Sequence, residues 1–184
     1  MAKSYFLLLL LVPVIVILTL LYIIYLPPVL LIRYFQHIWP DTLWLAATSK
    51  KIVALTIDDA PTDCIDDILD VLEKYKVRAT FFIIGTSALG RETNLERMVR
   101  SGHELGNHTM EDKPSISLGE LELKSQLDEV RRKIIEPAYD AAHREHPPNY
   151  FRPGSGFFSS WMRKLAATPP ESEYSSTPIS ENCV

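Results

Sequence analysis

Cysteine is scarce in this sequence, with Cys64 and Cys183 as the two examples in 184 residues. Two cysteines supply neither a disulfide framework nor a zinc knuckle, so we expect two unrelated thiols. An excess of positive charge is also missing, because the formal net charge is −4. Without a basic surface, nucleic acid is not expected as a partner. No glycine-rich phosphate loop follows a predicted strand, which argues against a phosphoryl-transfer protein.

A long uncharged segment at the N-terminus is the most prominent feature that is present. Residues 5–32 carry no charged side chain. About 18 apolar residues cross the hydrocarbon core of a bilayer, whereas the core of a signal peptide has roughly 7–15. We predict a membrane anchor over residues 1–32, with its helix ending at Pro27 and Pro28, and a juxtamembrane linker over residues 33–50. A signal sequence is the alternative. Aromatic rings suited to the membrane–water boundary lie nearby, namely Tyr22, Tyr25, Tyr34, Phe35, Trp39 and Trp44.

Beyond residue 50, short apolar segments alternate with segments of helical periodicity, which is typical of parallel α/β architecture. We count about four strand–helix units, whereas a closed (β/α) barrel has about eight. The folded module is expected over residues 51–167, and residues 168–184, which have no apolar period, are expected to be disordered. The predicted strands cover residues 51–59, 79–84, 103–106 and 150–151.

Local signals predict where the helices begin and which faces they bury. Pro61 and Asp63 suggest a helix start, Asn94 a helix cap closed by Gly102, and residues 160–167 a final helix. One predicted core face consists of Ile65, Ile68, Leu69, Leu72 and Tyr75. A capping box is predicted from Ser117 and Glu120, with Ile116 and Leu121 as its hydrophobic staple and a core face of Leu118, Leu121, Leu127, Val130 and Ile134.

Asp58 and Asp59 end the first predicted strand. Adjacent strand residues point to opposite sides, so one carboxylate could bind a metal while the other faces a water molecule. A solvated strand end or a helix cap is the alternative for a bare pair of acids.

Histidine supplies a second candidate group. His108 and Asp112 are four residues apart, which on a helical turn places both on one face, within reach of one metal ion. His103 and His108 are five apart, too far round a helix for a zinc-protease motif. We expect His103 to be a structural strand residue, and three other imidazoles to lie on the surface, namely His37, His143 and His146.

Arg152 opens a third candidate segment, in which it is followed by Pro153, Gly154 and Ser155. A fixed cation is thereby combined with a loop whose backbone N–H groups could face a developing oxyanion. A plain turn before a helix is the alternative.

The three candidate segments follow one another in a fixed order, each at the end of a predicted strand. They read Thr-Ile-Asp-Asp-Ala-Pro at 56–61, Gly-His-Glu-Leu-Gly-Asn-His-Thr at 102–109 and Phe-Arg-Pro-Gly-Ser-Gly at 151–156. With Ala-Thr-Phe-Phe-Ile-Ile-Gly at 79–85, this order resembles the successive motifs of the NodB-like polysaccharide deacetylases, carbohydrate esterase family 4. The resemblance covers residues 51–167. An ordered set of motifs is far harder to match by chance than a single one.

The resemblance implies a fold, an activity and a role for each residue. The fold is a distorted (β/α) barrel, and the activity removes N- or O-acetyl groups from polymers such as chitin or peptidoglycan. By resemblance, Asp58 is the general base, Asp59 and His108 are metal ligands, and Arg152 holds the base in place. The backbone N–H near Ser155 would join the metal in stabilising the oxyanion.

The chain departs from the family pattern at several positions. Asp112 stands where the family usually has a second histidine, so the metal site would combine two carboxylates with one imidazole. Such a donor set favours zinc, cobalt or manganese. Ala60 replaces the usual glycine after the paired acids, and Gly154 with Ser155 replaces the usual Pro-Tyr or Pro-Trp, which removes an aromatic stacking position for the substrate.

The family's later strands, with the Leu-x-His segment that supplies its general acid, have no counterpart after Ala167. We therefore expect about the N-terminal half of the barrel, with slow turnover, because general acid catalysis contributes about 10²–10⁴ in rate. Two hypotheses follow. The first is a membrane-anchored deacetylase of an N-acetylated, chitin-like polysaccharide, and the second is a truncated, inactive anchored relative that at most binds sugar.

Charge gives little information on topology, because Lys3 on one side of the anchor faces Arg33, Lys50 and Lys51 on the other. A polysaccharide substrate favours a single-pass protein with a cytosolic N-terminus and an extracytoplasmic catalytic domain.

A partial barrel leaves its last strand without a neighbour, so we expect residues 51–184 to be poorly soluble when expressed alone.

Overall fold

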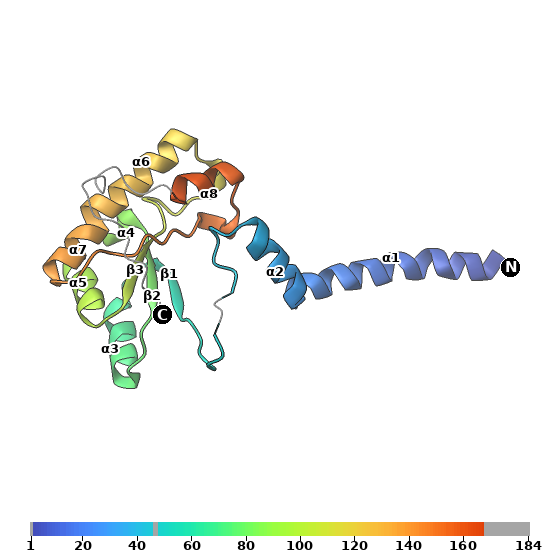
Figure 1. Cartoon of the computed structure of the whole chain (residues 1–184), viewed down its shortest axis with the longest axis horizontal. Helices are drawn as coiled ribbons and strands as arrows, with labels where there is room; N and C mark the ends of the chain where they lie inside the picture. The colour runs from blue at the N-terminus through green and yellow to red at the C-terminus, as the bar shows by residue number, and fades with distance from the viewer. Residues whose placement is uncertain (1, 46–47, 168–184) are drawn as a thin grey trace. The chain divides into compact units, whose positions relative to one another are not determined.

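The computed structural model describes residues 2–45 and 48–167 (Figure 1). The chain divides by its internal contacts into two compact units, Met1–Lys51 and Ile52–Val184. The first unit consists of helices, and the second holds the alternating strands and helices. The tail predicted over residues 168–184 lies outside the described residues, as does Cys183.

The first unit contains α1 (Ala2–Tyr25) and α2 (Val29–Ile38), separated at Pro27 and Pro28. The second of these helices lies largely within the segment expected to be a linker. Among the described residues, no single helix is long and apolar enough to cross a membrane. Leu11–Tyr25 and Val29–Ile38 together have the required length and composition, as a pair bent by 65°.

The second unit is organised around a parallel sheet of strand order β1-β2-β3. The strands are β1 (Thr56–Ala60), β2 (Thr80–Ile83) and β3 (Glu104–Asn107). Phe151 adds one parallel bridge to Asn107, so the fourth predicted strand is reduced to a single pair. The parallel α/β architecture predicted from the sequence is confirmed, and all three strands direct their carboxyl ends to one edge of the sheet.

The first strand is shorter and more exposed than the sequence pattern predicted. Pairing begins at Thr56, and the preceding residues lie in irregular chain, with Val53 95% exposed. The prediction of a buried strand over residues 51–59 is therefore wrong for its first half. The physical reason is position, because β1 is an edge strand with one neighbour and most of its residues remain accessible.

Helices connect the strands in the order that the sequence predicted. They are α3 (Ile65–Tyr75), α4 (Gly85–Ala88), α5 (Glu92–Arg100), α6 (Glu120–Val130), α7 (Glu136–Ala141) and α8 (Ser160–Ala167). Two 3₁₀ turns, η1 (Ser115–Ser117) and η3 (Gly154–Gly156), and a π-helical segment, η2 (Arg131–Ile135), complete the module.

The main hydrophobic core lies between the sheet and α3, α5 and α7, which run along one side of the strands (Figure 1). It includes Phe81, Ile83 and Leu105 from the strands, and Ile65, Leu69, Leu72, Leu95 and Met98 from the helices. A smaller cluster joins α6 and α8 through Leu118, Leu123 and Met162. Tyr75, predicted to belong to the α3 core face, is exposed because it lies at the helix end, next to the left-handed Lys76.

Two predicted helix caps are wrong. Asn94 lies inside α5, and its amide donates a hydrogen bond to Asp66 of α3 at 3.0 Å. The hydroxyl of Ser117 donates to the Pro114 carbonyl at 2.6 Å within η1, while α6 starts after Gly119. The predicted staple is absent as well, since Ile116 and Leu121 are both exposed. Asn94 is engaged by a neighbouring helix, and Ser117 by a carbonyl three residues before it.

The buried His103 generates a prediction about acid stability. It is 4% exposed, and its Nδ1 accepts a hydrogen bond from the Ala79 N–H at 3.1 Å. Burial, and secondly the charge of Arg78, lower the pKa of His103 below its ordinary value of 6.5. The unfolded chain therefore binds more protons than the folded chain between the two pKa values. The stability contributed by His103 is complete above about pH 6.5 and is lost as the pH falls through the folded-state pKa.

We expect His103→Asn, which keeps an acceptor for the Ala79 N–H, to reduce the acid-induced loss of stability, because asparagine has no group that titrates in this range. Urea unfolding at about pH 7.5 and pH 5, followed by circular dichroism, measures this loss. His146→Asn, at an exposed histidine, should keep the wild-type difference. An unchanged pH dependence in His103→Asn would contradict the assignment.

Candidate active site

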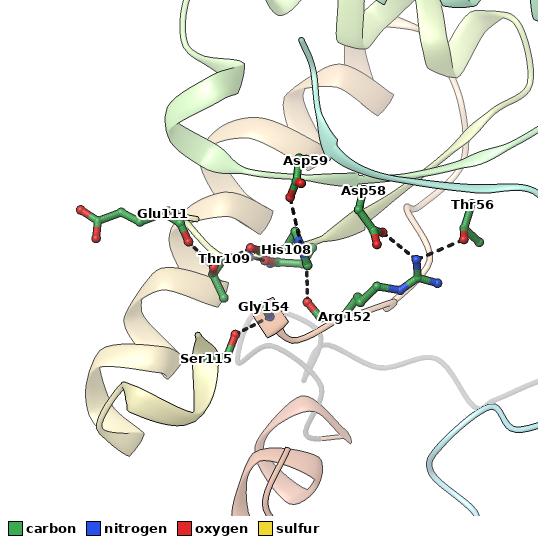
Figure 2. A network of polar contacts seen from close by, with 10 residues as sticks. Thr56, Asp58, Asp59, His108, Thr109, Glu111, Ser115, Arg152 and Gly154 are labelled. Carbon is green, nitrogen blue, oxygen red and sulfur yellow. Dashed lines mark hydrogen bonds and ion pairs between the residues drawn. The ribbon is translucent and has the colours of Figure 1, made fainter. Parts of the chain in front are cut away.

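The two paired acids lie where β1 departs from regular strand geometry. Between Ile57 and Ala60 the pairing shifts, because β1 advances by three residues while β2 advances by two. Asp59, inside this bulge, has a left-handed φ of 57°. The expectation that the two carboxylates point to opposite sides is wrong. An extra residue in a strand re-aims its side chains, and Figure 2 shows both carboxylates on the same side of the chain, with Asp59 directed toward His108 and Asp58 toward Arg152.

Asp58 is held by Arg152. The guanidinium Nη1 donates to Asp58 Oδ1 at 2.6 Å and to the Thr56 hydroxyl at 3.1 Å. Its central carbon also lies 4.0 Å from the ring centroid of Phe82, a cation–π contact. Both side chains of the ion pair remain partly accessible to solvent. The Asp58 carboxylate is therefore oriented without being sealed from a substrate or a water molecule.

Arg152 also orients His108, through its main chain. His108 Nδ1 lies 2.6 Å from the Arg152 carbonyl oxygen. A carbonyl oxygen can only accept, so Nδ1 carries a proton, and in the neutral form of the ring the lone pair is on Nε2. This Nε2 lies 3.4 Å from Asp59 Oδ1 (Figure 2). His108 itself is buried, whereas Asp59 is exposed.

The Asp59–His108 pair fits a metal-binding role. A hydrogen bond between an imidazole nitrogen and a carboxylate is usually about 2.7–3.2 Å long, and this separation is longer. Two ligands at about 2.0–2.1 Å from a tetrahedral zinc ion lie about 3.3 Å apart. Metal-bound histidines typically donate their other ring N–H to a carbonyl or carboxylate, as His108 does. The donor atoms and their orientation therefore suit a divalent ion.

Asp112 is not brought into this pair. The prediction assumed a helical turn over residues 108–112, but this segment is irregular and Thr109 has a φ of 71°. Asp112 is exposed, and in the part of the chain that the structure describes, no group of three His, Cys, Asp or Glu side chains could hold a metal. The spacing argument for Asp112 is wrong, because four-residue spacing places side chains together only on a helix.

The loop after Arg152 forms a tight turn packed against the segment that follows His108. Gly154 is buried and donates its N–H to the Ser115 hydroxyl at 2.8 Å. A Cβ atom at Gly154 would lie 2.3 Å from the Lys113 carbonyl oxygen, so only glycine fits there. Ser155 is exposed, with a φ of 65°. Over residues 48–167, no hydrogen-bond partner is found for its N–H, which leaves this donor available at the turn.

Several residues that shape the site were not identified from the sequence. Thr56 and Phe82 position the Arg152 side chain, and Ser115 fixes the Gly154 turn. Asn107 joins three segments through its side chain and backbone. Thr56 stands two residues before Asp58 and so shares a strand face with that acid, a signal that could have been used. The remaining three depend on segments that meet only in the fold.

The other histidines have the placement that their sequence context predicted. His103 is a buried structural residue next to β3, where it contacts the Phe81 ring edge-on. The three remaining imidazoles, His37, His143 and His146, are exposed. Cys64 is an exposed free thiol.

Comparison with known proteins agrees with this geometry. A family model described as "Polysaccharide deacetylase" matches residues 46–169. The chain is 39% identical over 100 residues to a chitooligosaccharide deacetylase of Sinorhizobium fredii, which covers 54% of this chain and 46% of that protein. It is 29% identical over 124 residues to a peptidoglycan-N-acetylglucosamine deacetylase of Bacillus cereus, which covers 67% and 55% respectively. The chain thus spans about half the length of the curated relatives it matches.

Solved structures show the same likeness. The peptidoglycan deacetylase PdaC of Bacillus subtilis superimposes with a TM-score of 0.55 at 30% identity, covering 63% of this chain and 55% of that one. A family 4 carbohydrate esterase of Streptomyces lividans, in complex with acetate, gives 0.54 at 25% identity, with coverages of 62% and 57%. The α/β module described above therefore has the fold of these enzymes. With a family model matched over more than half of its length, the chain belongs to the polysaccharide deacetylase family.

Proposed function

We propose that this protein is a hydrolase that removes acetyl groups from an N-acetylated, chitin-like polysaccharide, acting on carbon–nitrogen bonds other than peptide bonds. The observation that supports this most directly is the geometry around Arg152. Its guanidinium holds Asp58 while its carbonyl orients His108 toward Asp59. A base and a candidate metal-ligand pair are thereby fixed relative to each other. The curated relatives named above are deacetylases of N-acetylated sugars.

In the proposed mechanism Asp58 is the general base. The reaction adds water across the C–N bond of the acetamide, so that the water oxygen ends in acetate and the sugar nitrogen ends as an amine. Asp58, oriented by Arg152, accepts a proton from the attacking water. The Asp58 carboxylate is partly exposed beside the Arg152 guanidinium, so a water molecule can reach it.

Asp59 and His108 would hold a divalent ion, Zn²⁺ or else Co²⁺ or Mn²⁺. When bound, such an ion polarises the acetyl carbonyl and lowers the pKa of its water. The free N–H of Ser155, on the turn fixed by Pro153 and Gly154, would donate to the oxyanion.

Asp58→Asn should reduce acetate release from N-acetylated chitooligosaccharides by about 10²–10⁴-fold, because the amide keeps the side-chain shape but is a poor proton acceptor. Enzymatic acetate detection in the presence of Zn²⁺ or Co²⁺ measures the rate. Asp67→Asn, an exposed acid of α3, is the matched control and should retain wild-type activity. Equal rates for the two variants would show that Asp58 is not the base, and no acetate from the wild-type chain would refute the activity of this polypeptide.

Measuring metal retention distinguishes the proposed role of Asp58 from that of Asp59. Asp59→Ala and His108→Ala should each abolish retention of Zn²⁺ after gel filtration, whereas Asp58→Asn should retain it, because Asp58 contacts Arg152 rather than His108. Metal content per protein is read by atomic absorption. Asp112→Ala should retain Zn²⁺, because Asp112 is exposed and is not brought to the Asp59–His108 pair. Equal zinc content in the first three variants would overturn the assignment of roles.

The proposal includes the wider architecture and the location of the protein. The three-stranded sheet would be the N-terminal part of a distorted (β/α) barrel, which the partial coverage of the solved relatives supports.

The first unit would anchor the protein in a membrane as a single pass, with the catalytic domain extracytoplasmic. The uncharged segment over residues 5–32 supports this. So does the stacking of Phe35, Trp39 and Trp44, whose ring centroids lie 5.1 to 5.7 Å apart, because aromatic rings favour the membrane–water boundary.

If the bent pair of α1 and α2 spans a membrane, the double substitution Ile17→Arg with Leu20→Arg should release the protein, since each central arginine costs about 2.5–3.5 kcal/mol of insertion free energy. The wild-type chain should stay with phosphatidylcholine vesicles after extraction at alkaline pH. Leu89→Arg, at an exposed leucine of the α/β unit, should stay with them too. Retention of the double variant would contradict a spanning anchor.

A further inference from the structure

Asn107 is the last residue of β3 and immediately precedes His108. It is 8% exposed, and all four of its hydrogen-bonding groups have partners. Its N–H donates to the Tyr150 carbonyl at 2.8 Å, and its carbonyl accepts from the Arg152 N–H at 3.0 Å. Its side-chain Nδ2 donates to the Leu127 carbonyl at 2.8 Å, and its Oδ1 accepts from the Thr109 N–H at 3.0 Å. One buried residue therefore connects three separate segments.

The backbone groups of Asn107 fix the register of Arg152. Both hydrogen bonds flank the single bridge between Asn107 and Phe151, so the segment at residues 150–152 is paired to β3 at this point. The Arg152 carbonyl accepts from His108 Nδ1, and its side chain holds Asp58. A shift of one residue in this register would remove both contacts.

The side chain of Asn107 fixes the turn that follows His108. Thr109 has a left-handed φ of 71°, a conformation that a β-branched residue rarely adopts without support. The bond from Asn107 Oδ1 to the Thr109 N–H supplies that support. The hydrogen bond from Nδ2 to the Leu127 carbonyl attaches the same side chain to α6. The position of the turn is therefore fixed relative to this helix.

We propose that Asn107 is a positioning residue, which sets the ring orientation and the Nδ1–H tautomer of His108 by holding Thr109 on one side and Arg152 on the other. It does not touch the reacting atoms. The inference rests on the proposed function, because a fixed His108 Nε2 matters for catalysis only if it binds the metal.

Two variants of Asn107 distinguish the contributions of its two side-chain hydrogen bonds, to Thr109 and to Leu127. Asn107→Leu has a similar volume and removes both of them. Asn107→Asp keeps an acceptor for the Thr109 N–H but replaces the donor to Leu127. Asn94→Leu is the matched control, because it removes one amide hydrogen bond, from α5 to Asp66 of α3, that involves no site residue. Leu105→Val, a buried apolar change on the same strand, controls for a general loss of stability.

The readouts are the affinity of the full chain for Co²⁺, from its visible absorption, and the His108 tautomer in the metal-free chain, from ¹⁵N NMR. We expect Asn107→Leu to bind Co²⁺ about 10–100-fold more weakly and to lose the single Nδ1–H tautomer. Asn107→Asp should lie between it and the wild type, and both controls should match the wild type.

Wild-type affinity and tautomer in a folded Asn107→Leu variant would overturn the inference. If Asn107→Leu does not fold, the tautomer in Asn107→Asp decides, and an unchanged tautomer there overturns it. If neither Asn107 variant folds while Leu105→Val does, Asn107 supports the strand as a whole and the inference fails. Absence of Co²⁺ binding by the wild-type chain would instead refute the proposed metal site, and the tautomer would still test the role of Asn107.

Discussion

The arrangement of the site depends on Arg152, whose side chain contacts one site residue and whose main-chain carbonyl contacts another. Its guanidinium holds Asp58 and Thr56 on β1, and its carbonyl oxygen orients His108 after β3. An exposed ion pair of this kind contributes only about 0–1 kcal/mol to stability. The importance of Arg152 is therefore geometric, because it fixes a carboxylate and an imidazole from separate strands in one relative position. The Phe82 ring packs against the guanidinium.

The parallel sheet makes this convergence possible. In parallel strands joined by helices, the carboxyl ends lie at one edge, and here they present Asp58, Asp59 and His108 together with the segment at residues 151–156. The hydrophobic core lies on the side of α3, α5 and α7 and leaves that edge free for polar groups. Stability and chemistry thus use different parts of the same sheet.

Several departures from regular structure lie at this edge. The bulge at Asp58 and Asp59 directs both acids to one side, and positive φ angles occur at Asp59, Thr109 and Ser155. Such conformations carry a cost that the surrounding contacts must offset. At Thr109 the offset comes from the buried amide of Asn107, and at the Gly154 turn from the hydroxyl of Ser115. The irregular backbone is therefore held in place by hydrogen bonds from residues that do no chemistry themselves.

The sequence by itself determined the alternation of strands and helices, the helix at Ser160–Ala167, and the candidate residues Asp58, Asp59, His108 and Arg152, because periodicity and motif order are local properties of the chain. Only the tertiary structure decided which of these meet. It separated Asp112 from His108, since no helical turn forms there, and it turned two adjacent acids to one side through a bulge. The His108–Arg152 bond joins residues 44 positions apart. A contact of that range depends on strand register and core packing, which local sequence patterns do not encode.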